Sequence, residues 1–139
     1  MSTHPSVILL IDDEPDILKT LGRRLEQEGF ALLTANSGEA GLRIAQERQP
    51  DLVLLDIMMP KMKGRDVCAR LKANEHTADI PVIFLTALGL PDHVKASLDS
   101  GAEDYLVKPC DPRELKMRIQ ICLARHQARR AATRQTPQP

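Results

Sequence analysis

Short apolar runs recur along the chain, and most of them are continuous rather than interrupted by polar residues. They occupy residues 7–11, 30–33, 52–55, 82–85 and 105–107. Continuous runs of this length are typical of strands that are covered on both faces, as in a parallel sheet. The pattern therefore predicts five buried strands.

Segments with helical spacing lie between these runs. Apolar residues recur there at intervals of three and four, in helices predicted to open near Pro15, after Ser37, after Gly64, at Pro91 and after Pro112. Ser37 belongs to the residue types that cap helix N-termini, while Gly29 and Gly101 suit the ends of helices. Strand and helix thus alternate five times. The predicted fold is α/β, a (βα)5 doubly wound five-stranded parallel sheet of the flavodoxin-like order 2-1-3-4-5.

The apolar spacing fades after about residue 127. The length fits one domain, which we predict over residues 1–127. A basic, Pro-containing tail or linker follows over residues 128–139, and we interpret it as a frayed helix end and a disordered tail. From residue 111 onward seven Lys or Arg face two acidic residues. A basic tail can contact nucleic acid or an acidic partner. A solvated helix end is the simpler interpretation, and because aromatic residues are scarce we expect no direct nucleic-acid binding.

The composition limits the compartment. Hydrophobic residues make up 42% and charged residues 27%, as in ordinary soluble proteins. No apolar run approaches the roughly 20 residues that span a bilayer, and the N-terminus lacks the apolar segment of a signal peptide. Three widely spaced cysteines fit neither a disulfide framework nor a CxxC metal site, namely Cys68, Cys110 and Cys122. We therefore expect a cytoplasmic protein that does not contact the membrane.

Polar residues directly follow four of the five predicted strands. Asp12 and Asp13 end the first strand, Asp56 the third, Thr86 the fourth and Lys108 the fifth. In a doubly wound sheet, ligands bind outside the carboxyl ends of the strands where the strand order reverses, here between the first and third strands. These five residues are therefore the candidate site.

The chemistry of this set suits phosphoryl transfer. Crowded carboxylates repel, by about 4 kcal/mol for a pair about 4 Å apart at an effective dielectric of about 20, so a cation must compensate. Oxygen-only ligands favour Mg²⁺, and Lys108 supplies a fixed positive charge. Asp56, alone at the end of the central strand, is the best nucleophile, and Thr86 can sense the product. Taken singly, such residues are more often helix caps or solvated side chains, so the combination carries the prediction.

Four motifs resemble those of response-regulator receiver domains of two-component signal transduction. They are the Asp12-Asp13 pair after VILLI, LVLLDIMMPKMKG over residues 52–64, FLTA over 84–87 and GAEDYLVKP over 101–109. The resemblance extends from about residue 6 to about residue 125. Two positions depart from it, because Lys63 stands where the family often has Asp or Asn, and Cys110 where Phe is common. Lys63 adds charge near the rim of the site and could affect the choice of kinase.

The resemblance implies that Asp56 accepts a phosphoryl group from the phosphohistidine of a histidine kinase or a histidine phosphotransfer protein. Asp13, Asp56 and the backbone carbonyl of Met58 would hold Mg²⁺, and Asp12 would act through water. Such a protein is a phosphoacceptor rather than an enzyme, apart from its own Mg²⁺-dependent phosphorylation and dephosphorylation.

The resemblance also implies a conformational switch. Thr86 would move to hydrogen-bond the phosphoryl group, Tyr105 would swing from outward to inward, and Lys108 would pair with the phosphate. The Lys108–Pro109 peptide bond would be cis. The face made by the fourth helix, fifth strand and fifth helix would meet an effector or a second copy of the chain. Whether the receiver acts alone or within a larger regulator stays open at this point.

Two other classes share parts of this pattern. A haloacid-dehalogenase-type phosphatase also forms an aspartyl phosphate in an α/β fold, but it needs a second Asp two residues after the nucleophile, where this chain has Met58. A pseudo-receiver used purely for docking tends to lose one of the acidic pair, the central Asp or the Lys. This chain keeps all of them, which favours the phosphate-accepting receiver.

Overall fold

The computed structural model describes residues 4–87 and 91–135, without the side chains of residues 91–93, 97 and 133–135. In these ranges five strands alternate with five helices. In chain order they are β1 (Val7–Ile11), α1 (Pro15–Gln27), β2 (Ala31–Ala35), α2 (Gly38–Arg48), β3 (Leu52–Leu55), α3 (Gly64–Ala73), β4 (Val82–Thr86), α4 (Pro91–Asp99), β5 (Asp104–Val107) and α5 (Pro112–Gln135).

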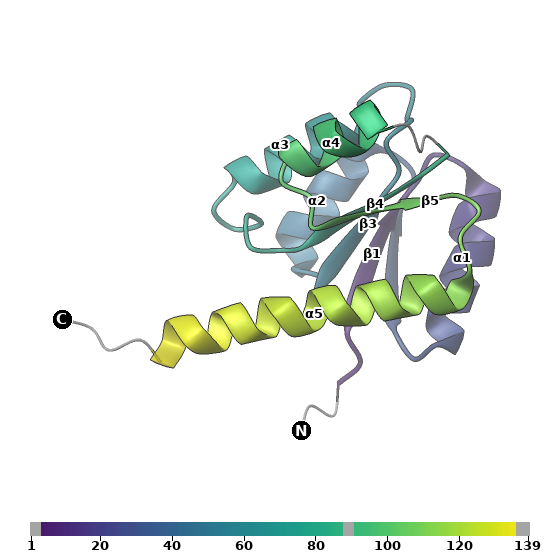
Figure 1. Ribbon diagram of the computed structural model, residues 1–139. Coiled ribbons are helices and arrows are strands. Elements are labelled where there is room, and N and C mark those ends of the chain that lie inside the picture. The colour runs from purple at the N-terminus through teal and green to yellow at the C-terminus, as the bar shows by residue number, and fades with distance from the viewer. Residues whose placement is uncertain (1–3, 88–90, 136–139) are drawn as a thin grey trace.

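The strands form one parallel sheet in the order β2-β1-β3-β4-β5, with β3 at its centre. Helices α1 and α5 cover one face, and α2, α3 and α4 cover the other (Figure 1). The predicted fold class and strand order are both confirmed. The order reverses between β1 and β3, so this is the point where the carboxyl ends of two strands leave room for a ligand.

The sheet is buried on both faces because its strands alternate between two cores. Leu9 and Ile11 of β1 pack with residues of α2 and α3, whereas Ile8 and Leu10 pack with residues of α1 and α5. All four side chains are at most 1% exposed. Side chains alternate along a strand, so a strand with two cores reads as a continuous apolar run.

Strand β2 differs from its predicted bounds. It covers Ala31–Ala35 instead of residues 30–33, because it pairs with the whole of β1, from Val7 opposite Ala31 to Ile11 opposite Ala35. Thr34 is exposed on this edge strand. The length of the partner strand set the end of β2, which the apolar run alone did not reveal.

Helix ends largely follow the predicted signals. The Ser37 hydroxyl accepts a hydrogen bond from the Ala40 N–H at 3.1 Å, which confirms the predicted N-cap of α2. Gly29 and Gly101, just past α1 and α4, adopt φ values of 96° and 106°. These left-handed conformations favour glycine because a side chain there would clash with the backbone.

Helix α5 is longer than predicted. It has 24 residues and ends at Gln135, although the apolar stripe fades after about residue 127. Residues 128–135 are therefore helical rather than disordered, because Ala, Arg and Gln favour helix without needing a core. Residues 136–139 lie outside the described ranges, and the role of residues 128–139 as a linker stays a prediction. Over the described ranges, no helix is apolar enough along its length to cross a bilayer.

Candidate functional site

Three carboxylates meet at the point where the strand order reverses. Asp12 and Asp13 follow β1 and Asp56 follows β3, and one oxygen of each lies within 4.8 Å of the others. The register explains the encounter, because Ile11 at the end of β1 is paired with Leu55 at the end of β3. Asp12 is 1% exposed and Asp56 is 5% exposed, whereas Asp13 is half-buried.

The Lys108 ammonium reaches the same cluster from β5. Its Nζ atom lies 2.8 Å from Asp12 Oδ2 and 3.7 Å from Asp56 Oδ2. The Lys108 backbone N–H donates to the Thr86 carbonyl at 2.7 Å, which ties the ends of β4 and β5 together. The Lys108–Pro109 peptide is cis, the isomer that the resemblance implies. The closest carboxylate to Lys108 is thus Asp12, and Asp56 is its second neighbour.

Burial and charge act against each other on these groups. Burial raises the pKa of Asp56, and the Lys108 charge and the Met58 N–H only partly offset this rise. For Lys108, burial favours a lower pKa, but the hydrogen bond to Asp12 and the charge of Asp56 outweigh it and the pKa rises. The lysine is therefore a fixed cation, while Asp56 is a carboxylate that its surroundings stabilise incompletely.

Backbone N–H groups orient the two buried carboxylates. Asp56 Oδ1 accepts from the Met58 N–H at 3.1 Å, and Asp12 Oδ1 accepts from the Glu14 N–H at 2.9 Å. The second oxygen of each is the one that approaches Lys108. The Met58 side chain is 60% exposed, and the predicted ligand role of its backbone carbonyl stays a prediction.

The donor set fits a hard divalent cation. Among the residues that the structure describes, three carboxylates face one ammonium, so the cluster carries an excess of negative charge in a largely buried place. Its ligand atoms are all oxygens, which Mg²⁺ prefers, and half-buried Asp13 leaves room for metal-bound water. Asp12, Asp13 and Asp56 are thus the residues that could hold Mg²⁺.

The two predicted switch residues lie on adjacent strands. Thr86, at the end of β4, is fully buried. Tyr105 on β5 is paired with Phe84, which lies two residues before Thr86 on β4. Burial raises the pKa of the Tyr105 phenol, and the charge of Arg65 only partly opposes this rise. The aromatic ring packs against the core on the α2 and α3 side of the sheet. The Tyr105 hydroxyl is buried as well, so this side chain already has an inward position, and its movement stays a prediction.

Gly64 supports the site in a way that its sequence position did not reveal. We expected it only to open α3. Its N–H donates to the Ile57 carbonyl at 2.9 Å, and a Cβ atom on it would lie 2.7 Å from the Ile57 Cα and closer still to the Asp56 carbonyl oxygen. The absent side chain lets the loop close over the backbone of the phosphoacceptor candidate. A glycine shortly after a strand-end carboxylate was the available signal.

Comparison with known proteins identifies the family. The family model of the response regulator receiver domain matches residues 8–120. Among curated relatives, the DNA-binding dual master transcriptional regulator RpaA of Synechocystis sp. PCC 6803 is 46% identical over 85% of this chain and 49% of its own length. The phosphate regulon transcriptional regulatory protein PhoB of Pseudomonas aeruginosa is 42% identical over 85% of this chain and 52% of its own.

Solved structures agree with this family. A response regulator receiver domain protein from Clostridium thermocellum has a TM-score of 0.82 and 36% identity, over 88% of this chain and 98% of that one. The receiver domain of a sensor histidine kinase from Pseudomonas aeruginosa PAO1 has a TM-score of 0.81 and 28% identity, over 86% and 98%. That structure holds a magnesium ion in its active-site cleft.

The chain spans about half the length of the curated relatives it matches. The expectation of no direct nucleic-acid binding gains no support from them, because one is named as a DNA-binding regulator. The matched model covers most of the chain, and the described fold agrees with it. The chain belongs to the response regulator receiver domain family.

Proposed function

We propose that this chain accepts a phosphoryl group on Asp56 from the phosphohistidine of a histidine kinase or a histidine phosphotransfer protein, and changes conformation in response. The observation that carries the proposal is the environment of Asp56. It is a buried carboxylate at the end of the central strand, beside two further carboxylates and one ammonium. Family membership supports the same reaction.

Asp56 acts as the nucleophile. A carboxylate oxygen bonds to phosphorus, the P–N bond to the donor histidine breaks, and the electron pair leaves with the imidazole. Burial makes the Asp56 carboxylate less stable as an anion, which favours its reaction. Asp56 Oδ1 is already held by the Met58 N–H, so the carboxylate is oriented before the donor arrives.

Mg²⁺ held by Asp13, Asp56 and the Met58 carbonyl, with Asp12 acting through water, would neutralise the oxygens of the transferred group. The magnesium in the related kinase receiver supports this assignment. Lys108 adds a fixed charge, since its ammonium is 3.7 Å from Asp56 Oδ2 and can pair with the phosphoryl group once it is attached there. Beyond its own phosphorylation and dephosphorylation, we propose no enzymatic activity.

Thr86 and Tyr105 would report the modification. The Thr86 hydroxyl moves toward the phosphoryl group, and the space it leaves fixes Tyr105 inward. Because Tyr105 is already turned inward, phosphorylation would hold this position rather than create it. The face formed by α4, β5 and α5 then meets an effector or a second copy. In a longer protein like the relatives, an output region would receive the signal, and transcriptional regulation is the proposed result. The cytoplasmic location expected from composition stays a prediction.

The test is direct labelling. The purified chain is incubated with Mg²⁺ and acetyl phosphate, and its intact mass is measured. We expect the gain of one phosphoryl group that is lost in hydroxylamine, as an acyl phosphate should be. Asp56→Asn should abolish it, whereas the control Asp79→Asn, an exposed carboxylate before β4, should label normally. Full labelling of Asp56→Asn would overturn the site, and an unlabelled wild type would overturn the function.

A further inference from the structure

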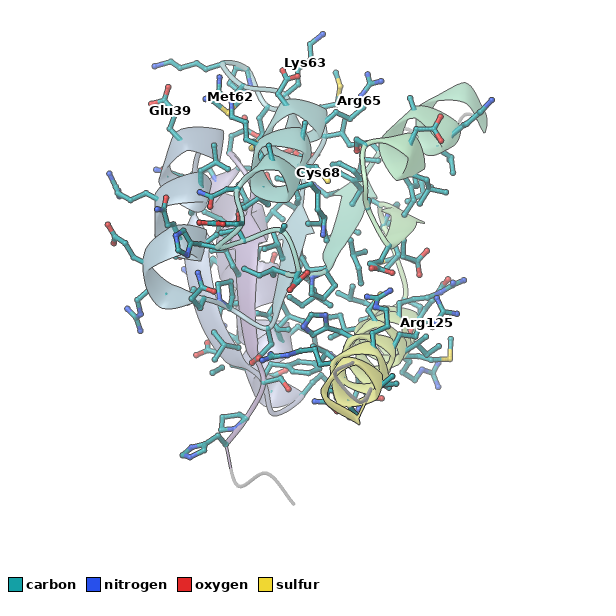
Figure 2. The ribbon with its side chains drawn as sticks, turned by 90° about the vertical axis from the view of Figure 1, so that its left-hand side faces the viewer. Glu39, Met62, Lys63, Arg65, Cys68 and Arg125 are labelled. Atoms are coloured by element: carbon teal, nitrogen blue, oxygen red, sulfur yellow. The ribbon has the colours of Figure 1, made fainter. Side chains whose placement is uncertain are left out.

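The loop between β3 and α3 carries a group of cations that the reaction above does not use. Lys61 and Lys63 are exposed, and Arg65 in the first turn of α3 is half-buried. In the part of the chain that the structure describes, none of the three forms an ion pair or a side-chain hydrogen bond. Figure 2 shows Lys63 and Arg65 at the end of α3 that lies toward the carboxyl edge of the sheet. We refer to Lys61, Lys63 and Arg65 as the basic loop.

Gly64 fixes the basic loop over the phosphoacceptor. Its backbone is packed against the backbones of Asp56 and Ile57, with the N–H donated to the Ile57 carbonyl. Lys63 and Arg65 are the residues on either side of Gly64. They therefore project from a segment in direct contact with the backbone of Asp56, and they cannot move far from it while the loop is closed.

The basic loop also extends to both sides of the site. On one side, Lys61 lines a cavity of about 260 Å³ together with Asp13. On the other side, the charge of Arg65 acts to lower the pKa of the Tyr105 phenol, against the effect of burial. Lys61, Lys63 and Arg65 line one further hollow, where Asp66 is the acidic neighbour. The cations thus run along the rim from the metal-binding side to the switch side.

An anionic donor meets opposing forces at this edge. The carboxylates of Asp12, Asp13 and Asp56 repel it, and Lys108 offsets only one of their charges. Lys61 and Lys63 of the basic loop are exposed to solvent, where charges act on a molecule before it binds. A rim of one sign raises the local concentration of oppositely charged reactants and hence the rate of association.

We propose that Lys61, Lys63 and Arg65 attract the anionic phosphoryl donor to Asp56, and thereby favour donors that carry more negative charge. This rests on the proposed function. With acetyl phosphate, an Asp56 carboxylate oxygen bonds to phosphorus, the bond from phosphorus to the acetate oxygen breaks, and acetate leaves with the electron pair. The basic loop takes no part in that exchange and acts on the approach of the donor alone.

Two small donors of different charge test the proposal. Acetyl phosphate is a dianion at neutral pH and phosphoramidate is a monoanion. Labelling rates per molar donor are measured by intact mass, with saturating Mg²⁺, for wild type and for the triple variant Lys61→Gln, Lys63→Gln, Arg65→Gln. At low salt we expect the triple variant to lose about fivefold with acetyl phosphate and only about twofold with phosphoramidate, because Coulomb energy scales with the charge of the donor.

Salt provides the second arm. At about 1 M salt the screening length falls to about 3 Å, so wild type and triple variant should react at nearly equal rates. A matched control removes three exposed cations elsewhere, with Arg43→Gln and Arg48→Gln on α2 and Arg125→Gln on α5. This control changes the net charge equally and should retain wild-type rates and their salt dependence.

The outcomes separate this proposal from the one it rests on. If wild type is labelled but the triple variant reacts as fast as wild type with each of the two donors, the basic loop is ordinary solvated surface and this inference is wrong. Equal losses with both donors that persist at high salt would also overturn it. Mg²⁺ affinity, measured by calorimetry, should stay the same or increase in the triple variant. A loss of Mg²⁺ binding would assign these residues to the shape of the loop instead. An unlabelled wild type would overturn both proposals.

Discussion

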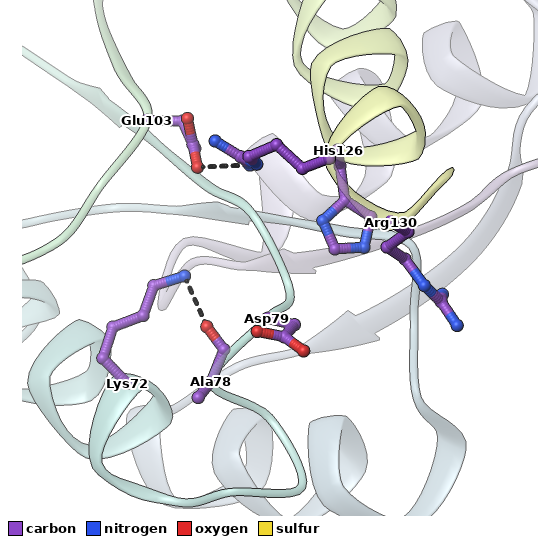
Figure 3. A pocket seen from close by; sticks show the side chains of 7 residues that line it. Lys72, Ala78, Asp79, Glu103, His126 and Arg130 are labelled. Atoms are coloured by element: carbon purple, nitrogen blue, oxygen red, sulfur yellow. Dashed lines mark hydrogen bonds and ion pairs between the residues drawn. The ribbon is translucent and has the colours of Figure 1, made fainter. Parts of the chain in front are cut away.

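The two edges of the sheet hold charge in different ways. At the carboxyl edge, three carboxylates share the Lys108 ammonium, and Asp12 and Asp56 are almost completely buried. At the amino edge, acidic and basic side chains line an open cavity of about 480 Å³, namely Lys72, Asp79, Glu103, His126, Arg129 and Arg130 (Figure 3). There Glu103 and Arg129 form an ion pair at 2.8 Å.

This difference separates a site from a surface. Charges of both signs that stay near water cost little and contribute little. A buried excess of one sign costs free energy unless a ligand supplies the missing charge. The carboxyl edge therefore favours binding of a cation and a phosphoryl group, while the charges at the amino edge need no ligand to balance them. The effects of substitutions at the two edges on the free energy of unfolding should therefore differ in size and, for Asp56, in sign.

Removal of the Lys108 cation should have the largest effect. Lys108→Gln leaves Asp12 and Asp56 facing each other without an ammonium, and loss of one partner of a buried ion pair costs about 3–5 kcal/mol. We expect the lower end, because the Lys108 side chain is 19% exposed. Urea denaturation without Mg²⁺ measures this. Lys19→Gln, exposed on α1, should change stability by less than about 0.5 kcal/mol. A similarly small loss for Lys108→Gln would remove the contrast between the edges.

Gly64→Ala should come next, with a loss of about 1–3 kcal/mol from overpacking. The new Cβ would meet the backbones of Asp56 and Ile57, which cannot move aside cheaply. Gly22→Ala is the matched control, since its Cβ would lie 2.7 Å from a flexible Leu32 side-chain atom and Ala favours the helix. Thermal denaturation of both variants should show the larger drop for Gly64→Ala, and equal drops would contradict the close approach.

Asp56→Asn should change stability in the opposite direction. An amide of the same shape relieves the repulsion in the cluster, so the free energy of unfolding should rise on the order of 1 kcal/mol without Mg²⁺. Mg²⁺ at about 100 times its dissociation constant should add about 2.7 kcal/mol to wild type and much less to the variant. Destabilisation by Asp56→Asn would mean that the cluster is not under electrostatic stress.

The amino edge should respond weakly. Glu103→Gln removes the ion pair with Arg129, which is half in solvent, so the loss should be under about 1 kcal/mol and should shrink in about 1 M salt. Phosphoryl labelling of this variant should match wild type. A loss of stability as large as that of Lys108→Gln would show that the ion pair between Glu103 and Arg129 contributes as much to folding as the buried ion pair of the site.

The smallest expected effect is a pH dependence at His126. Burial lowers its pKa below the ordinary 6.5, helped by Arg130 and Arg129. As pH falls from 6.5, the unfolded chain therefore takes up this proton before the folded one, and stability decreases. His126→Gln should remove about a few tenths of a kcal/mol of this decrease between pH 7 and 5. The exposed His76→Gln should leave it in place, and equal slopes for both variants would contradict the assignment.

Much of the fold could be read from single residues and their neighbours. The run 52–55 predicted β3 at its observed bounds, because every residue of this strand is apolar and buried. For residues 128–135 the apolar pattern predicted a tail, whereas they continue helix α5, because residues that favour helix need no apolar face. An apolar pattern thus marks where a core ends, and a helix can continue past it.

For the candidate site, too, part of the arrangement follows from the sequence and part from the tertiary structure. The sequence by itself determined that Asp12, Asp13, Asp56, Thr86 and Lys108 end neighbouring strands, since chain order and the rules of parallel sheets place strand ends together. Only the tertiary structure decided that Lys108 lies nearer to Asp12 than to Asp56, and that Gly64 closes the loop onto the Asp56 backbone. Such distances depend on rotamers and on contacts between segments far apart in the chain, which no local pattern encodes.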